Sequence, residues 1–133
     1  MSTVSTEGSI LLSVKKMLGI EDAGHQFDVD LIIHINSVFS ILTQIGIGPD
    51  KSFAIADEQS KWTDFLADDT EAYKVEMVKT YMYLKVRQMF DPPANSFVVE
   101  SFNKQIAELE WRLSVAYTPV IDGKGGDDSN DDQ

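Results

Sequence analysis

The stretch DDTEAYKVEMVKTYMYLKVRQMFDPP, residues 68–93, decides the fold, because it predicts a long helix that is apolar around most of its circumference. Asp68 and Glu71 resemble a capping box at its start, and Asp91-Pro92-Pro93 ends it, because proline has no amide hydrogen. A helix with so little polar surface is expected at the centre of the protein. Its apolar residues fall in two rows with helical spacing, Val75, Val78, Met82, Val86 and Met89 in the first and Met77, Tyr81 and Leu84 in the second.

The two prolines also predict that the chain turns back into a last helix. Ser96 is expected to cap this helix, which runs to about Tyr117 before Pro119. Because the two helices are consecutive and the connection is short, we expect an antiparallel hairpin whose apolar stripes face each other. The stripe of the last helix consists of Val99, Phe102, Ile106, Leu109, Leu113 and Ala116.

Charged residues of alternating sign recur at every fourth position of this last helix. Each i, i+4 pair stabilises a helix by only about 0.2–0.5 kcal/mol. The row therefore predicts a face turned toward water or a polar partner, and it does not have the pattern of a catalytic carboxylate pair. It consists of Glu100, Lys104, Glu108 and Arg112.

Two apolar patterns nearer the N-terminus predict two more helices. The first is short and is expected to end at Gly19 in the left-handed conformation. The second is expected to be capped by Asp28, to end at Gly46 and to cover the hairpin. The stripe of the first helix is Ile10, Leu11, Val14, Met17 and Leu18; that of the second is Leu31, Ile32, Ile35, Val38, Phe39, Leu42 and Ile45, opposite a polar face with Asp30, His34, Ser37 and Gln44.

The helical period is lost between residues 50 and 68. Phe53-Ala54-Ile55-Ala56 is too short for a helix and predicts a short strand or extended arm, and Trp62, Phe65 and Leu66 predict one helical turn. A lone strand needs a hydrogen-bonding edge from elsewhere, so pairing with a neighbouring subunit is one hypothesis. The alternative is an ordered loop that its apolar side chains hold in place.

These patterns together predict a mainly α protein. We expect a small bundle of about four helices, with a short helical turn and a short extended arm or strand. Residues 1–8 are expected to form a flexible N-terminal arm, residues 9–118 the helical domain, and residues 119–133 an acidic, flexible C-terminal tail.

Composition excludes several classes of function. The net charge of −11 disfavours binding to nucleic acid, because an acidic surface repels the phosphate backbone. The absence of Cys excludes thiol nucleophiles and thiolate metal sites. The longest apolar runs, such as residues 31–33, are far shorter than a membrane span, so we expect a soluble protein made in a cytoplasm.

The sequence offers no set of residues for catalysis. His25 and His34 are the only histidines, and their spacing does not match metal ligands. No nucleophile motif or phosphate-binding loop is present, so we expect neither an enzyme nor a cofactor or metal site. The aromatic and Met residues of the 68–93 stretch are interpreted as core and subunit packing rather than as a cofactor site.

Six segments, taken together and in this order, resemble the head-tail connector (adaptor) proteins of tailed phages. The resemblance runs over about residues 9–117, and its specificity comes from the combination, since each segment alone is short. The segments are SILLSVKKMLG (9–19), DLIIHINSVF (30–39), QIGIGP (44–49), VKTYMYLKVR (78–87), FDPP (90–93) and IAELEWRL (106–113).

The resemblance implies a structural subunit of the virion at the head-tail junction. Such subunits form a ring, typically of about twelve copies, beneath the portal protein. The ring would extend the channel through which DNA passes without sequence-specific binding, and it would dock the next head-tail adaptor or tail protein. The resemblance implies no catalysis. It does not extend to residues 122–133, so it assigns them no role.

A ring subunit needs two different, complementary faces. Candidates are the extended arm, the helical turn, the proline corner and the charged row. The alternative function is an acidic interaction module that mimics DNA and inhibits a host DNA-binding protein, which predicts a monomer or dimer with acids clustered on one folded face. The candidate interface residues are Phe53, Ala54, Ile55, Ala56, Trp62, Phe65, Asp91, Pro92, Pro93, Glu100, Lys104, Glu108 and Arg112.

Overall fold

The computed structural model describes residues 5–118, in which the chain forms five α-helices, one 3₁₀ turn and no β-strand. The predicted mainly α fold, a small helical bundle, is confirmed. The predicted acidic tail, residues 119–133, and residues 1–4 of the predicted N-terminal arm lie outside the described residues. The elements are α1 (Ile10–Leu18), η1 (Glu21–Ala23), α2 (Asp28–Ile45), α3 (Trp62–Phe65), α4 (Ala72–Phe90) and α5 (Ser96–Tyr117).

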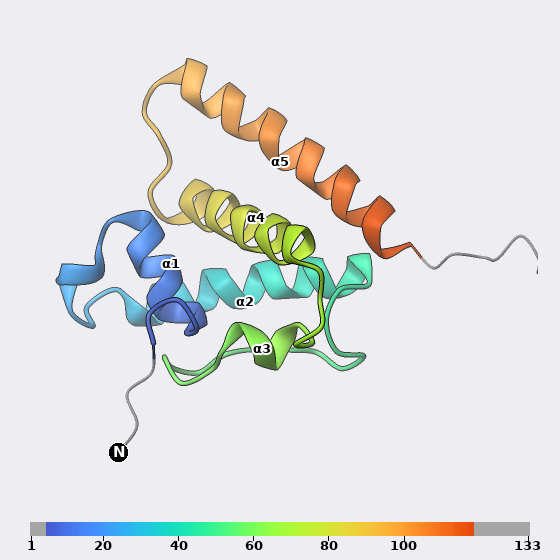
Figure 1. Cartoon of the computed structure of the whole chain (residues 1–133). Coiled ribbons are helices and arrows are strands. Elements are labelled where there is room, and N and C mark those ends of the chain that lie inside the picture. Colours follow the sequence, from blue (N-terminus) through green and yellow to red (C-terminus); the bar gives the residue numbers. More distant parts are fainter. Residues whose placement is uncertain (1–4, 119–133) are drawn as a thin grey trace, which may run out of the picture.

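Helix α4 is the central helix, as its two apolar rows predict (Figure 1). Helix α5 runs antiparallel to α4 along one side, which confirms the predicted hairpin, and α2 lies on the other side (Figure 1). Helix α2 packs mainly against α4 and touches α5 only slightly, so it covers one helix of the hairpin rather than both. Helix α1 packs against α2 and α4 and closes that side of the core.

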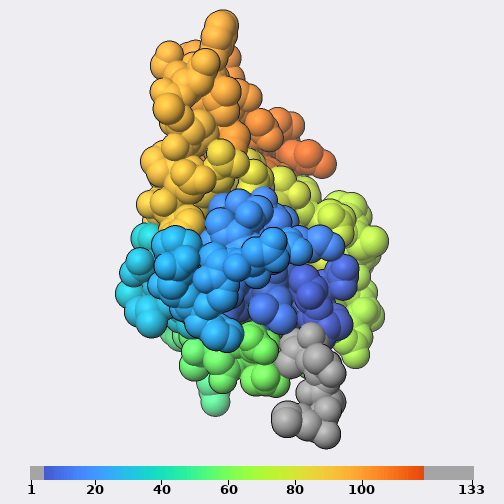
Figure 2. Space-filling model, turned by 90° about the vertical axis from the view of Figure 1, so that its left-hand side faces the viewer, coloured from blue at the N-terminus to red at the C-terminus, as the bar shows by residue number. Residues whose placement is uncertain are grey.

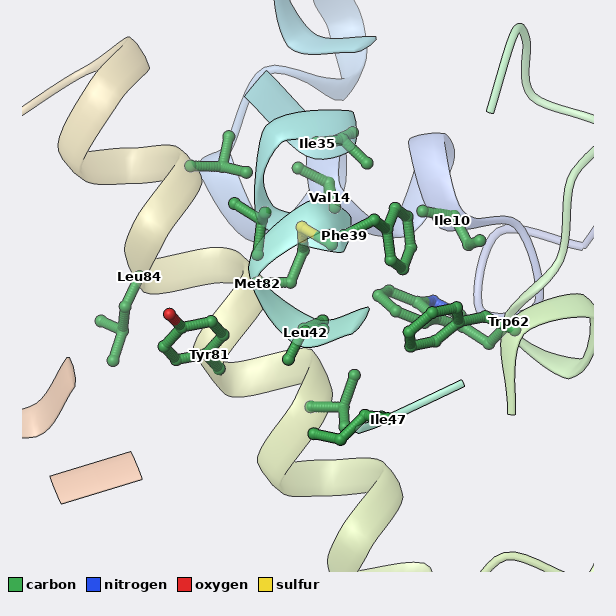
Figure 3. Packing of buried hydrophobic residues seen from close by; sticks show 14 of the residues in the cluster. Ile10, Val14, Ile35, Phe39, Leu42, Ile47, Trp62, Tyr81, Met82 and Leu84 are labelled. Carbon is green, nitrogen blue, oxygen red and sulfur yellow. The ribbon is translucent and has the colours of Figure 1, made fainter. Parts of the chain in front are cut away.

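The core combines α1, α2 and α4 with the loop between α2 and α4 (Figure 3). Phe39 of α2 is fully buried and lies at the centre of an aromatic cluster. Its ring centroid is 4.9 Å from that of Phe53, 6.2 Å from that of Trp62 and 4.5 Å from that of Phe65. These rings attach the long loop to α2, because each contact buries a large apolar surface.

The segment Phe53–Ala56 is an ordered loop, so the alternative of a strand is wrong. The Ile55 N–H donates to Oδ1 of Asn36 (2.8 Å), and Nδ2 of Asn36 donates to the Ile55 carbonyl (3.0 Å). The Asn36 amide therefore satisfies both backbone groups of Ile55, as a neighbouring strand would. The hypothesis of pairing with a neighbouring subunit supplied these backbone hydrogen bonds from another chain. In the structure they come from the same chain, from a residue of α2 nineteen positions away.

The predicted helical turn is α3, and it is held against the start of α1. The indole Nε1 of Trp62 donates to Ser13 Oγ (2.9 Å), and its backbone N–H donates to the Gly8 carbonyl (3.0 Å). Ser9, the N-cap of α1, forms an isolated antiparallel bridge with Lys61. These bonds join residues about fifty positions apart in the sequence and bury the side chain of Trp62 in the core.

The glycine ends of two helices are confirmed, but three predicted caps are wrong. Gly19 and Gly46 end α1 and α2 in the left-handed conformation. Glu71 is the N-cap of α4 but makes no side-chain cap bond, so there is no capping box with Asp68. The cap of α5 is Asn95, not Ser96; its Oδ1 accepts from two backbone N–H groups of the first turn, at 2.8 and 3.3 Å.

Asp28 does not cap α2, because its carboxylate is bound to other side chains. It lies inside the first turn and accepts from Lys15 Nζ at 2.8 Å, and His25 Nδ1 lies 2.8 Å from its other oxygen. Lys15 is buried and also donates to the Gly24 carbonyl at 2.6 Å. Burial alone would raise the pKa of Asp28, but the hydrogen bonds from Lys15 and His25 outweigh it and hold the pKa below its ordinary value.

Replacing Asp28 with asparagine is expected to lower the free energy of unfolding by about 1.5–3 kcal/mol at pH 7, the range for a hydrogen bond to a charged group. The folded-state pKa is lowered, so the stabilisation is complete above the unfolded pKa of about 4 and is lost as the pH falls through the folded value. Urea denaturation at pH 7 and in acid measures this. The loss of unfolding free energy caused by Asp28→Asn should be smaller in acid than at pH 7. Asp30→Asn, exposed in the same turn, is the matched control; an Asp28→Asn penalty that does not change with pH would contradict this assignment.

Among residues 5–118, only α2 meets the length and hydropathy criteria of a membrane span, with a mean hydropathy of 1.2. The core helix of a globular bundle meets the same criteria. Helix α2 carries Asp28 and Asp30 in its first turn, and its apolar stripe packs against α4 and α1. We therefore describe α2 as a core helix.

Candidate interaction surfaces

The sequence-predicted interface residues divide into buried and exposed groups. Ile55, Trp62 and Phe65 are only 4, 4 and 3 % exposed, so their side chains form the core and are not available to a partner. Phe53 is half-buried in the aromatic cluster. The remaining candidates lie at least partly on the surface, and they are Ala54, Ala56, Asp91, Pro92, Pro93, Glu100, Lys104, Glu108 and Arg112.

The charged row of α5 is exposed along its whole length. Within the described part of the chain, none of Glu100, Lys104, Glu108 and Arg112 forms an ion pair. The acid that ties α5 to α4 is Glu110, which accepts a hydrogen bond of 2.7 Å from the buried hydroxyl of Tyr81. Burial and this bond raise the pKa of Tyr81 well above its ordinary value.

Helix α2 has an apolar ridge on its outer face, formed by Val29 and Ile33 and called the α2 ridge. These side chains are 72 % and 60 % exposed, and they lie one helical turn apart. Sequence analysis assigned a polar character to this face. The run Leu31-Ile32-Ile33 could have predicted an exposed apolar residue on α2. Three consecutive helical residues span about 200° around the helix, so they cannot all face the core.

A second apolar surface lies between α4 and α5, where Tyr73 and Met77 face Trp111 and Val115; we call it the α4–α5 groove. It consists of two adjoining hollows of about 500 and 280 Å³ that share Tyr73, Met77 and Arg112. Trp111 is 67 % exposed, although tryptophan is usually well buried. Trp111 was not among the predicted interface residues, and its exposure is seen only in the fold.

The third apolar surface is the tip of the hairpin. The proline corner leads into the first turn of α5, where Phe97 and Val98 are exposed. Figure 2 shows this end of α5 projecting from the body of the molecule. Phe97 is 82 % exposed, so it has little contact with its own subunit.

The described residues contain no group of three or more His, Cys, Asp or Glu side chains that could hold a metal ion. The exposed apolar surfaces are therefore the main features beyond the core that need an explanation. Contiguous apolar patches on small soluble proteins mark sites of association. The α2 ridge, the α4–α5 groove and the tip of the hairpin are therefore candidate sites of contact with another protein.

Comparison with known proteins agrees with this arrangement. A family model described as phage connector protein matches residues 10–120, which include every helix of the structure. No curated protein and no solved structure matches the chain. The matched family is structural, and its members are virion components at the junction of head and tail. The helical bundle with its outward apolar surfaces, matched over most of its length, thus belongs to the phage connector protein family.

Proposed function

We propose that this chain is the subunit of a homo-oligomeric ring in the head-tail connector of a tailed phage. Copies of the chain, about twelve in number, would assemble below the portal protein. The ring would extend the DNA channel and dock the next head-tail adaptor or the tail. The observation that supports this proposal best is the family match over residues 10–120, combined with several separate apolar surfaces on one small subunit.

The charge of the chain supports a passive role toward DNA. With 22 acidic and 11 basic residues, the protein has few cations to replace the counterions of a phosphate backbone. DNA in a channel lined by such subunits would stay mobile and would not be bound by sequence. The exposed charged row and proline corner are proposed as surfaces toward neighbouring proteins.

Sedimentation and electron microscopy of the purified protein, alone and mixed with the portal ring of its phage, test this proposal. We expect ring-sized particles, or sedimentation of many copies together with the portal. A protein that stays monomeric and does not bind the portal would contradict it. In that case the DNA-mimic alternative predicts binding to a host DNA-binding protein in competition with DNA, which the same method detects.

A further inference from the structure

We infer that the α2 ridge of one copy packs into the α4–α5 groove of the next copy, and that this contact joins neighbouring subunits of the ring. This inference rests on the proposed function and names the interface that it requires. The ridge contributes Val29 and Ile33, and the groove is formed by Tyr73, Met77, Trp111 and Val115.

The ridge and the groove lie at opposite ends of the subunit. Phe27, just before α2, contacts Phe90 at the end of α4, with ring centroids 5.4 Å apart. The smaller hollow of the groove instead involves the first turns of α4, at Tyr73 and Met77. The helical rise of 1.5 Å per residue places these two ends of α4 about 20 Å apart.

The views agree with this separation, since α2 begins at the left of Figure 1 and α4 begins at the right. Ridge and groove therefore cannot meet within one subunit, but those of successive copies can. A contact between two different surfaces at opposite ends is heterologous, and repeated with a closing rotation it makes a ring. A contact between two ridges or two grooves would stop at a dimer.

The two surfaces match in spacing. The ridge is an i, i+4 pair, and the groove runs between two such pairs, Tyr73 with Met77 and Trp111 with Val115. Helices pack by placing the i, i+4 ridge of one between corresponding rows of others. Around the ridge, Ser37 and Ser40 are small exposed residues that allow a second copy to approach α2 closely.

The ridge and the smaller hollow of the groove also carry charges of opposite sign. Two copies with a net charge of −11 each repel, so a contact between them is favoured where a cation of one meets an anion of the other. Arg112 is exposed and lines both hollows of the groove. The larger hollow is also lined by Glu76 and Glu108, whereas in the smaller one Arg112 is the only charged residue among residues 5–118, so the ridge is expected to pack at the smaller hollow. Asp30 is exposed beside Val29, and neither Arg112 nor Asp30 forms an ion pair within residues 5–118.

Because the chain has no cysteine, a disulfide between introduced cysteines tests the contact directly. The test variant is Ile33→Cys with Val115→Cys, assembled as the wild type assembles, alone or on the portal, and then mildly oxidised. We expect a ladder of covalent multimers on a non-reducing gel, while each single variant stays monomeric. The matched control is Ile33→Cys with Val98→Cys, which places the second cysteine on the same helix but at the tip, and it should give no ladder.

Several outcomes would overturn the inference. Single variants that form covalent dimers would show that like surfaces meet. Rings that form without a ladder would show that the groove holds another occupant, such as the portal or residues 119–133 of the same chain. Wild-type protein that forms no assembly even with the portal would instead reject the proposed function itself, and the inference with it.

Exchange of the two charges provides an independent test. Asp30→Arg and Arg112→Asp should each raise the protein concentration needed for half-assembly about tenfold, since each places like charges at the contact. The combined variant should return to within about threefold of the wild type, because the pair is restored with its signs reversed. Additive losses in the combined variant, with the fold intact by circular dichroism, would overturn the pairing.

Discussion

Replacing Phe39 with alanine is expected to lower the free energy of unfolding by about 3–5 kcal/mol, the usual cost of removing a buried aromatic side chain. Phe39 is fully buried, and its ring contacts those of Phe53, Trp62 and Phe65. The substitution removes these contacts and leaves a cavity between α2 and the loop that precedes α4. The loop is anchored by these same rings, so it cannot close the cavity without giving up its other contacts.

Equilibrium urea denaturation followed by circular dichroism measures this loss. Phe97→Ala is the matched control, because Phe97 is 82 % exposed and the same atoms are removed. Its effect on the free energy of unfolding should stay within about 0.5 kcal/mol, as for other surface substitutions. Similar losses for the two variants would mean that Phe39 does not lie at the centre of the core.

Replacing Gly48 with alanine is expected to lower the free energy of unfolding by about 2–5 kcal/mol. Gly48 has a φ of 90°, a conformation that costs an L-residue about 1–2 kcal/mol. In addition, a Cβ at this position would lie 2.3 Å from Cε1 of Phe65, so the ring must move within a packed core, which costs about 1–3 kcal/mol. The two effects add because they act on different atoms.

Gly46→Ala separates these two costs. Gly46 also has a positive φ, of 105°, but a Cβ there meets nothing within 4 Å. The control should therefore lose only the conformational contribution of about 1–2 kcal/mol. The difference between the variants in urea denaturation measures the contact with Phe65, and equal losses would show that Phe65 can move away freely.

The Phe39 and Gly48 variants both change the packing of the loop between α2 and α4. The conformation of this loop was difficult to predict from the sequence. The helices themselves followed from local patterns: a 3.6-residue period for the apolar stripes, glycines at the ends of α1 and α2, and two prolines at the corner between α4 and α5. These signals act within a few residues. They therefore depend little on how the rest of the chain folds.

The conformation of Phe53–Ala56 depends on a residue that is distant in the sequence. The same four residues fit a strand, an arm or a loop, and the choice was made by Asn36, which binds both backbone groups of Ile55. Asp28 was likewise drawn away from capping α2 because Lys15, thirteen positions earlier, required a charged partner in a buried site. Neither partner is visible in a local window of sequence.

The exposure of apolar side chains was also predicted poorly, for the same reason. The exposed face of α5 followed from its charges, and Arg112 does lie in the α4–α5 groove. Trp62 and Phe65 were interface candidates, yet they are buried, while Val29 and Trp111 were not candidates and are exposed. An apolar side chain looks the same in the sequence whether its own chain or another chain covers it.

The sequence by itself determined the helices, their order and their C-terminal ends, because hydrogen bonds within a helix and the backbone limits of glycine and proline are local. Only the tertiary structure decided which apolar side chains were left uncovered. Burial depends on which distant elements meet, and the core around Phe39 and Tyr81 can hold only a limited volume at native packing density. Apolar residues beyond that volume remain on the surface, among them Val29 and Ile33 at one end and Trp111 and Val115 at the other.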